Sequence, residues 1–121
     1  MTENDAVYTK DKKRLVVFVN NEAEEFKIPY GVEIIGAESF SKREKIKILT
    51  IPDTITAIES NAFERCYSLE KLEIPNSIES IKECFQEASS LKEITIDKPK
   101  GSITGSPWGC VYGERAIKWL R

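Results

Sequence analysis

The sequence of 121 residues predicts a repeat solenoid, in which similar β-rich coils stack along one axis. The first observation is an Ile-Pro pair that recurs at a constant interval, at Ile28-Pro29, Ile51-Pro52 and Ile74-Pro75. The second is that the apolar residues between these pairs recur at the same interval. After Ile51 they are Ile55, Ile58, Phe63, Leu69 and Leu72. A fixed period of roughly 23 residues is typical of a chain in which each repeat is one supersecondary unit stacked on the next.

The flanking repeats keep this register with one exception. After Ile28 the matching residues are Val32, Ile35, Phe40, Ile46 and Leu49, and after Ile74 they are Ile78, Ile81, Phe85, Leu91 and Ile94. One residue is missing between Ile81 and Phe85, so the next start, Ile96, comes one position early. We therefore expect about three repeats of roughly 22–23 residues each. They occupy residues 26–96 and place Phe40, Phe63 and Phe85 in one buried column.

Each repeat is predicted to begin with a strand. The alternation Leu72-x-Ile74 is that of a half-buried strand with these two side chains inward. Pro75 ends the strand because proline has no amide hydrogen to donate to a ladder. Ile78 and Ile81 are then expected to point inward from a bend on the far wall of the coil.

A short helical turn is predicted next in each repeat. Asn61 and Glu64 have the spacing of a capping box, which favours one turn of helix that buries Phe63. Ser80 and Glu83 have the same spacing in the following repeat. The predicted fold is thus dominated by β-strands, with short helical turns.

Both ends of the chain are predicted to be caps around one domain of residues 1–121. Residues 7–9 and 15–19 flank a polar turn and indicate a β-hairpin, so residues 1–25 form the N-terminal cap. Ile117 and Trp119 follow Ile94 and Ile96 by one repeat length, which predicts a last strand within a C-terminal cap of residues 97–121. Trp108 is expected to plug that cap.

The repeat pattern resembles that of the BspA-like leucine-rich-repeat family. The pattern L-x-x-L-x-I-P-x-x-I-x-x-I-x-x-x-A-F-x-x-C can be read here from residues 69–75 and 51–66. The resemblance implies a leucine-rich-repeat solenoid that acts through binding rather than catalysis, in a family found in bacterial surface and secreted proteins and in some protozoan parasites. Arg43 and Ala88 stand at the family's cysteine position, and Ser39 and Cys84 at its alanine position, which predicts uneven packing at the helical turns.

Composition and charge narrow the possible partners. The net charge is −2 and basic residues are interleaved with acids, which argues against nucleic-acid binding. The cluster of Lys10, Lys12, Lys13 and Arg14 is the basis of the alternative, a polyanion binder. No apolar run has membrane-spanning length. The first residues do not resemble a signal peptide, so we expect a cytoplasmic protein unless a leader precedes Met1, whereas the family resemblance suggests a surface or secreted one.

Catalytic and metal sites are not predicted. The chain has no histidine, which excludes Cys–His and Ser–His nucleophiles, and it has no phosphate-loop motif. Cys66 and Cys84 fall at inward positions of the repeat, while Cys110 lies in the terminal loop, where it could be exposed. A cysteine-dependent enzyme using Cys110 is therefore the second alternative. Three scattered cysteines do not make a zinc site, so we expect no metal and no cofactor.

The predicted binding surface is the outward face of the repeat strands. Side chains that alternate with the core positions project in rows, and a protein partner of unknown identity is expected there, bound by a monomer. The residues of this face are Glu25, Lys27, Ile48, Thr50, Lys71, Glu73, Glu93 and Thr95. The loop of residues 107–112 is the rival site.

Overall fold

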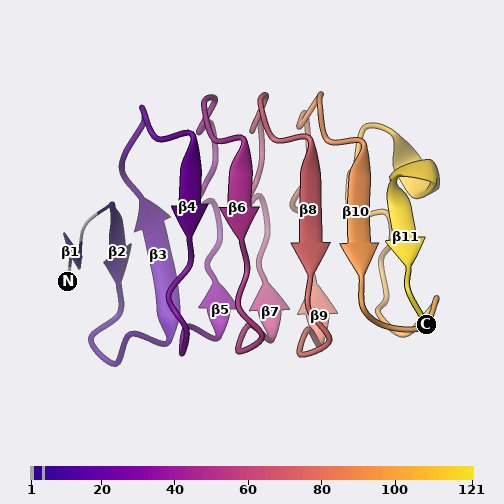
Figure 1. Cartoon of the computed structure of the whole chain (residues 1–121), viewed down its shortest axis with the longest axis horizontal. Helices are drawn as coiled ribbons and strands as arrows, with labels where there is room; N and C mark the ends of the chain where they lie inside the picture. The colour runs from indigo at the N-terminus through magenta and orange to yellow at the C-terminus, as the bar shows by residue number, and fades with distance from the viewer. Residues whose placement is uncertain (1, 4) are drawn as a thin grey trace.

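The computed structural model describes residues 2–3 and 5–121 and shows the predicted β-solenoid. Successive coils lie side by side along the long axis, with the two termini at opposite ends (Figure 1). Each of the three predicted repeats contributes one strand to a front wall and a shorter strand to a back wall. Within the described residues, no helix is long and apolar enough to cross a membrane.

The front wall holds the strands that start each repeat. Its strands are parallel wherever they pair, as expected for coils that wind in one direction. They are β4 (Glu25–Lys27), β6 (Ile48–Thr50), β8 (Lys71–Ile74), β10 (Glu93–Ile96) and β11 (Ile117–Trp119). β8 ends at Ile74, immediately before Pro75, as predicted.

The back wall is a sheet where the sequence predicted only an inward bend. Its strands run in the order β1-β2-β3-β5-β7-β9. They are β1 (Thr2–Glu3), β2 (Ala6–Tyr8), β3 (Arg14–Phe18), β5 (Ile34–Ile35), β7 (Ala57–Ile58) and β9 (Ser80–Ile81). The antiparallel pair β2–β3 is the predicted hairpin, and it extends the back wall because β3 pairs in parallel with β5.

A stacked column of phenylalanines runs through the core, as the register predicted. Ring centroids are 5.5 Å apart between Phe40 and Phe63 and 5.7 Å apart between Phe63 and Phe85. Phe18 from the hairpin extends the column, 5.1 Å from Phe40. All four rings are fully buried. The N-terminal cap thus shares the core of the repeats.

The predicted helical turns are wrong. No helix follows Asn61, which has φ of 60° in the left-handed region, and Ser80 lies in β9 instead. The Asn61 side chain accepts a hydrogen bond from Gln86 Nε2 at 3.0 Å and does not cap its own segment. The Phe63 amide donates to the Cys84 carbonyl of the next coil, at 2.9 Å. These turns therefore hydrogen-bond to their neighbours, as strands do, and the only helix of the described chain is the 3₁₀ helix η1 (Gly113–Ala116).

One departure from the family pattern ties the N-terminal cap to the first repeat. Arg43 stands where the family has cysteine, and its Nε donates to the Phe18 carbonyl at 2.6 Å. Its Nη1 also donates to the Ser41 carbonyl at 3.2 Å. Ser39, the other departure in this repeat, is fully buried, and its hydroxyl has no hydrogen-bond partner.

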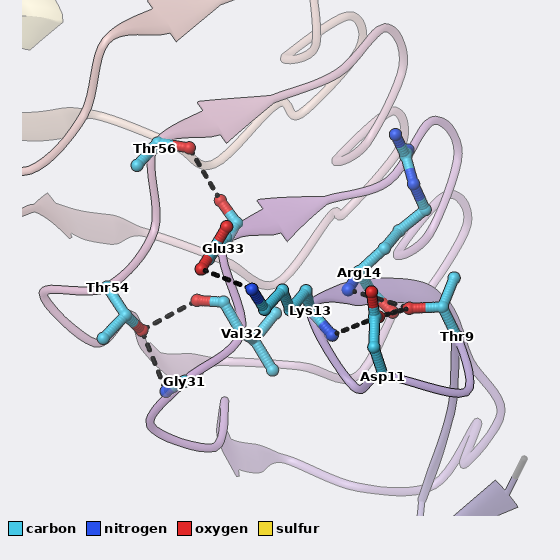
Figure 2. A network of polar contacts seen from close by, with 9 residues as sticks. All are labelled: Thr9, Asp11, Lys13, Arg14, Gly31, Val32, Glu33, Thr54 and Thr56. Atoms are coloured by element: carbon cyan, nitrogen blue, oxygen red, sulfur yellow. Dashed lines mark hydrogen bonds and ion pairs between the residues drawn. The ribbon is translucent and has the colours of Figure 1, made fainter.

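Polar contacts fasten the turns beside the hairpin (Figure 2). Thr54 Oγ1 accepts from the Gly31 amide at 3.0 Å and donates to the Val32 carbonyl at 2.7 Å, which links two successive coils. Lys13 of the hairpin turn lies 3.8 Å from a carboxylate oxygen of Glu33. These bonds satisfy loop peptide groups that have no ladder partner.

The C-terminal cap is formed as predicted. β11 pairs with β10 so that Ile117 lies beside Ile94 and Trp119 beside Ile96. Trp108 is 1% exposed, and its carbonyl accepts from the Phe85 amide at 3.1 Å. The tryptophan therefore closes the end of the core.

Candidate binding groove on the front wall

The structure places all eight residues of the predicted binding face on the outside of the front wall. Strand register places Glu25 beside Ile48 and Lys27 beside Thr50 in one part of the wall, and Lys71 beside Glu93 and Glu73 beside Thr95 in the other. Six of them are exposed, and Glu93 and Thr95 are half-buried. The eight residues therefore lie on one outer surface, but the sheet that carries them is interrupted.

The front wall is broken between β6 and β8. Its strands form two separate sheets, β4-β6 and β8-β10-β11, whereas the back wall runs without interruption through the same repeats. Figure 1 shows β6 and β8 standing farther apart than the other neighbouring front strands. The break lies in the middle of the predicted binding face.

The break leaves peptide groups of β6 without a strand partner. The Ile48 amide donates to the Glu24 carbonyl at 3.1 Å, and the Thr50 carbonyl accepts from the Ile28 amide at 3.0 Å. The peptide groups of both residues therefore point toward β4. Because these groups alternate in direction along a strand, the amide and carbonyl of Leu49 point toward β8.

The facing edge of β8 is exposed in the same way. The Glu70 carbonyl accepts from the Glu93 amide at 3.3 Å, and Leu72 lies beside Ile94 in the β8–β10 ladder. By the same alternation, the amides and carbonyls of Lys71 and Glu73 point toward β6. β6 and β8 therefore face each other without forming a hydrogen-bonded ladder.

A groove of about 480 Å³ lies over this break. Leu49 and Ile51, 7% and 9% exposed, are its most buried residues, whereas Leu72 and Ile74 at the matching positions of the next repeat are 1% and 2% exposed. Ile48 stands at the rim with 55% of its surface exposed. The groove is lined by Lys47, Ile48, Leu49, Thr50, Ile51, Ser68, Glu70, Lys71 and Glu73.

The groove includes half of the predicted face. Ile48, Thr50, Lys71 and Glu73 line it, whereas Glu25, Lys27, Glu93 and Thr95 lie outside it. Sequence reasoning missed the other lining residues because it assumed that neighbouring strands pair throughout the wall. The step across the break, from Ile51 to Ile74, has the same length as the step from Ile28 to Ile51 between the paired strands β4 and β6, so the period itself carries no signal of the break.

The β8 rim of the groove carries two charged side chains, Lys71 and Glu73. Lys47 lies 3.5 Å from Glu24, and outside the groove Lys118 lies 3.5 Å from Glu93. Lys71 and Glu73 form no ion pair within the described part of the chain. One rim therefore presents a cation and an anion two residues apart, both open to a partner.

The cysteines are core residues. Burial raises the pKa of the Cys66 thiol to about 12 and raises that of Cys84 as well. Cys110 lies in the terminal loop but is not exposed there: only 8% of its surface is accessible, because the loop folds over the last coil. Its Sγ lies 3.8 Å from the Leu91 carbonyl, and burial raises its pKa. The thiolate that a cysteine nucleophile needs is disfavoured at all three positions.

The basic cluster of the hairpin is interleaved with acids. Arg14 forms an ion pair with Glu59, and Lys13 pairs with Glu33. Asp11 lies inside the cluster and accepts from the Lys13 amide at 3.0 Å, which lowers the pKa of its carboxyl, as does its bond with Thr9. These carboxylates reduce the positive potential that a polyanion would need.

The loop of residues 107–112, the rival site, packs over the C-terminal end of the core. Trp108 Nε1 donates to the Thr104 carbonyl at 2.8 Å, and Trp108 is buried against Trp119, with ring centroids 6.1 Å apart. Val111 is the apolar residue that this loop exposes, at 54%.

Three bacterial proteins of known structure share this architecture. A leucine-rich repeat protein from Eubacterium ventriosum is 26% identical, with a TM-score of 0.80, over 98% of this chain and 32% of its own. The pneumococcal vaccine antigen PcpA is 19% identical, with a TM-score of 0.59, over 96% of this chain and 36% of its own. A leucine-rich repeat protein of T. pallidum is 15% identical, with a TM-score of 0.54, over 82% of this chain and 59% of its own. The last two show the fold alone.

The chain spans about a third of the length of the first two of these structures. No curated protein matches it. The model of the BspA-type leucine-rich repeat region matches residues 15–110, with six copies of the repeat. The match begins inside the hairpin, in agreement with the way β3 joins the back wall. The chain therefore belongs to the BspA-type leucine-rich repeat family.

Proposed function

We propose that this chain is a non-enzymatic protein-binding module whose contact surface is the outward face of the front wall, centred on the groove between β6 and β8. The observation that carries the proposal is the break itself. It combines an exposed apolar residue, Ile48, with two facing strand edges that do not pair, in a wall where every other two neighbouring strands are paired. Unpaired strand edges and exposed apolar side chains are the features by which sheets associate with other chains.

We also propose a bacterial surface or adhesion-related role. Support comes from the family and from the pneumococcal antigen among the proteins of the same fold. Five strands at the spacing of a paired ladder, about 4.8 Å, give the front wall a width of about 20 Å, to which the break adds. Since a standard interface covers about 800 Å² on each partner, a partner would also contact the edges of the wall.

A capture experiment with two matched variants tests the contact surface. The full chain is immobilised and exposed to solubilised surface proteins of mammalian epithelial cells. Ile48→Glu adds a charge at the groove, and Val111→Glu adds the same charge at a residue of nearly equal exposure, 54% against 55%, in the rival loop. Both variants are first checked for an unchanged circular dichroism spectrum and melting temperature.

The proposal expects Ile48→Glu to abolish capture of a specific protein that Val111→Glu still captures. The reverse result would assign binding to the loop of residues 107–112. Equal capture by both variants would show that the groove is not the contact surface.

A further inference from the structure

We propose that the groove binds an extended segment of a partner protein, whose main chain pairs with the free edge of β8 and which carries one acidic and one basic side chain two residues apart. This inference rests on the proposed function and specifies the chemistry of its partner. It is carried by the main-chain groups and the charges at the break.

The main-chain argument is one of hydrogen-bond complementarity. Lys71 and Glu73 each direct an amide donor and a carbonyl acceptor into the groove, and Leu49 directs its own pair from the opposite rim. Donors and acceptors that alternate along an edge are matched by the backbone of an extended peptide, which presents both at the same interval. A small rigid ligand or a single ion would satisfy only part of such an edge.

The charge argument sets the composition of the segment. Lys71 and Glu73 project on the same face of β8, two residues apart, and neither has an ion-pair partner within the described residues. A strand beside β8 places its own side chains i and i+2 opposite them. An acidic side chain opposite Lys71 and a basic side chain opposite Glu73 are favourable, whereas like charges at these places repel. This holds for a segment that runs in either direction along β8. The segment therefore carries one acid and one base.

The apolar floor provides the remaining contact. Leu49 and Ile51 are partly open at the bottom of the groove, and Ile48 stands on its rim. The side chain between the acidic and basic residues of the segment points to the opposite face of its strand, toward this floor. We therefore expect a small apolar residue such as valine at that position. The volume of about 480 Å³ lies within the range of ligand pockets, about 300–1,000 Å³.

Room for the segment comes from further opening at the break. A strand between β6 and β8 needs two ladder spacings, about 9.6 Å. β6 and β8 can move to this separation without the loss of a ladder in the front wall, because they are not paired. The ladder β5-β7-β9 of the back wall keeps the coils on the two sides of the break joined.

Synthetic peptides test the charge pattern. The probes are acetylated and amidated heptapeptides with the centre Glu-Val-Lys, Lys-Val-Glu, Glu-Val-Glu or Lys-Val-Lys, each flanked by two threonines on either side. Binding to the full chain is measured by NMR titration of the backbone amides. We expect at least one mixed-charge peptide to bind ten-fold or more tightly than either like-charge peptide, with the largest shifts at Leu49, Lys71 and Glu73.

Two charge reversals make the test specific to the groove. Lys71→Glu leaves two acids on the rim and should transfer the preference to the Lys-Val-Lys peptide. Lys82→Glu makes the same change at an exposed residue directly after β9, in the back wall and away from the proposed binding face, and should leave the preference for mixed charge intact. A preference that Lys71→Glu does not alter would overturn the assignment of the site.

N-methylation tests the main-chain pairing. Each amide of the tightest-binding peptide is methylated in turn, which removes one donor at a time. At least one position should weaken binding ten-fold, and full retention at every position would overturn the pairing with β8.

The failures of the two proposals are distinguishable. If none of the peptides binds at millimolar concentration but capture of a protein remains sensitive to Ile48→Glu, the extended-segment inference is wrong and the binding face stands. If capture is also insensitive to Ile48→Glu, both fail. A dimer that forms without any peptide and is lost in Ile48→Glu would show that a second copy fills the groove, which also overturns this inference.

Discussion

The two walls of the solenoid are built from the same repeats, yet they are joined differently at one boundary. In the back wall, β7 and β9 pair with Ile58 beside Ile81, and the Lys82 amide donates to the Ile58 carbonyl at 2.9 Å. In the front wall, the strands of those repeats, β6 and β8, belong to separate sheets. The turns between the walls remain joined, because the Arg65 amide donates to the Gln86 carbonyl at 2.9 Å.

This difference shows that neighbouring coils can stay stacked when strand pairing joins them in only one of the two walls. The phenylalanine column, the turns and the back wall together keep the repeats stacked, so the front wall is free to open at one boundary. A solenoid distributes its stability over neighbouring interfaces, and one interface can therefore lose a ladder without loss of the fold.

The largest expected effect comes from the core that both walls share. Phe63→Ala should lower the free energy of unfolding by about 3–5 kcal/mol, because it removes a fully buried ring between Phe40 and Phe85. Urea unfolding followed by circular dichroism measures this loss. Tyr30→Ala, at a residue 80% exposed, is the matched control and should change stability by less than about 0.5 kcal/mol. An unchanged melting temperature in Phe63→Ala would contradict the column.

A pair of leucine substitutions compares the two parts of the front wall. Leu72→Ala, in the three-stranded sheet, should cost about 3–5 kcal/mol, since Leu72 is 1% exposed. Leu49→Ala should cost about 2–3 kcal/mol, because Leu49 already contacts the open groove and a smaller side chain leaves less of a closed cavity. Urea titrations of the two variants measure the difference. Equal losses would indicate that the groove closes in solution.

Amide hydrogen exchange tests the break directly. The amides of Lys71 and Glu73 point into the groove, whereas that of Leu72 lies in the β8–β10 ladder. We expect the first two to exchange about 100-fold faster than the third, because they have no ladder partner. NMR-detected exchange at neutral pH resolves them residue by residue. Similar protection of all three would mean that β6 and β8 pair in solution.

Alkaline pH should weaken the shared core. Burial raises the pKa of Cys66 from 9.0 to about 12, so the folded state keeps this proton at a pH where the unfolded state loses it. The contribution to stability is fully present below pH 9.0 and is lost as the pH rises from there toward about 12. Between pH 8 and pH 10 the wild type should lose about 1 kcal/mol more than Cys66→Ala, as measured by urea unfolding. Parallel pH profiles for the two proteins would show that the thiol is not buried.

The smallest expected effect is a gain in stability. Ser39 buries a hydroxyl that has no partner, so Ser39→Ala should raise the free energy of unfolding by about 1 kcal/mol. Ser41→Ala is the control, because its hydroxyl bonds to Glu64 Oε1 at 3.0 Å, and it should be neutral or destabilising. Thermal unfolding of both variants decides this. A loss of stability in Ser39→Ala would imply that the hydroxyl has a partner in solution.

Much of the fold could be predicted from the repeat alone. The recurrence of apolar residues from repeat to repeat placed Phe40, Phe63 and Phe85 in one column and Ile117 beside Ile94, and the structure shows both. Such positions are predictable because their environment repeats, so each repeat confirms the register of the next. The outward positions of the front strands follow from the same alternation, and all eight residues of the predicted face lie on the outside of the front wall.

Local signals within one repeat were less reliable. Asn61 and Glu64 have the spacing of a capping box, but Asn61 adopts a positive φ and bonds across to Gln86. A capping box describes a segment that satisfies its own amides, whereas in this solenoid the neighbouring coil supplies acceptors, such as the Cys84 carbonyl for the Phe63 amide. Cys110 likewise lies in a segment rich in glycine and proline, yet that loop folds inward over the core.

The sequence by itself determined the period, the inward and outward faces and the family, because hydrophobic side chains recur wherever the chain returns to the same side of the coil. Only the tertiary structure decided where the front wall breaks and which residues therefore form a groove. A ladder depends on the distance between two strands, which is set by the packing of the core beneath them, and that distance is not encoded in the spacing of residues along the chain.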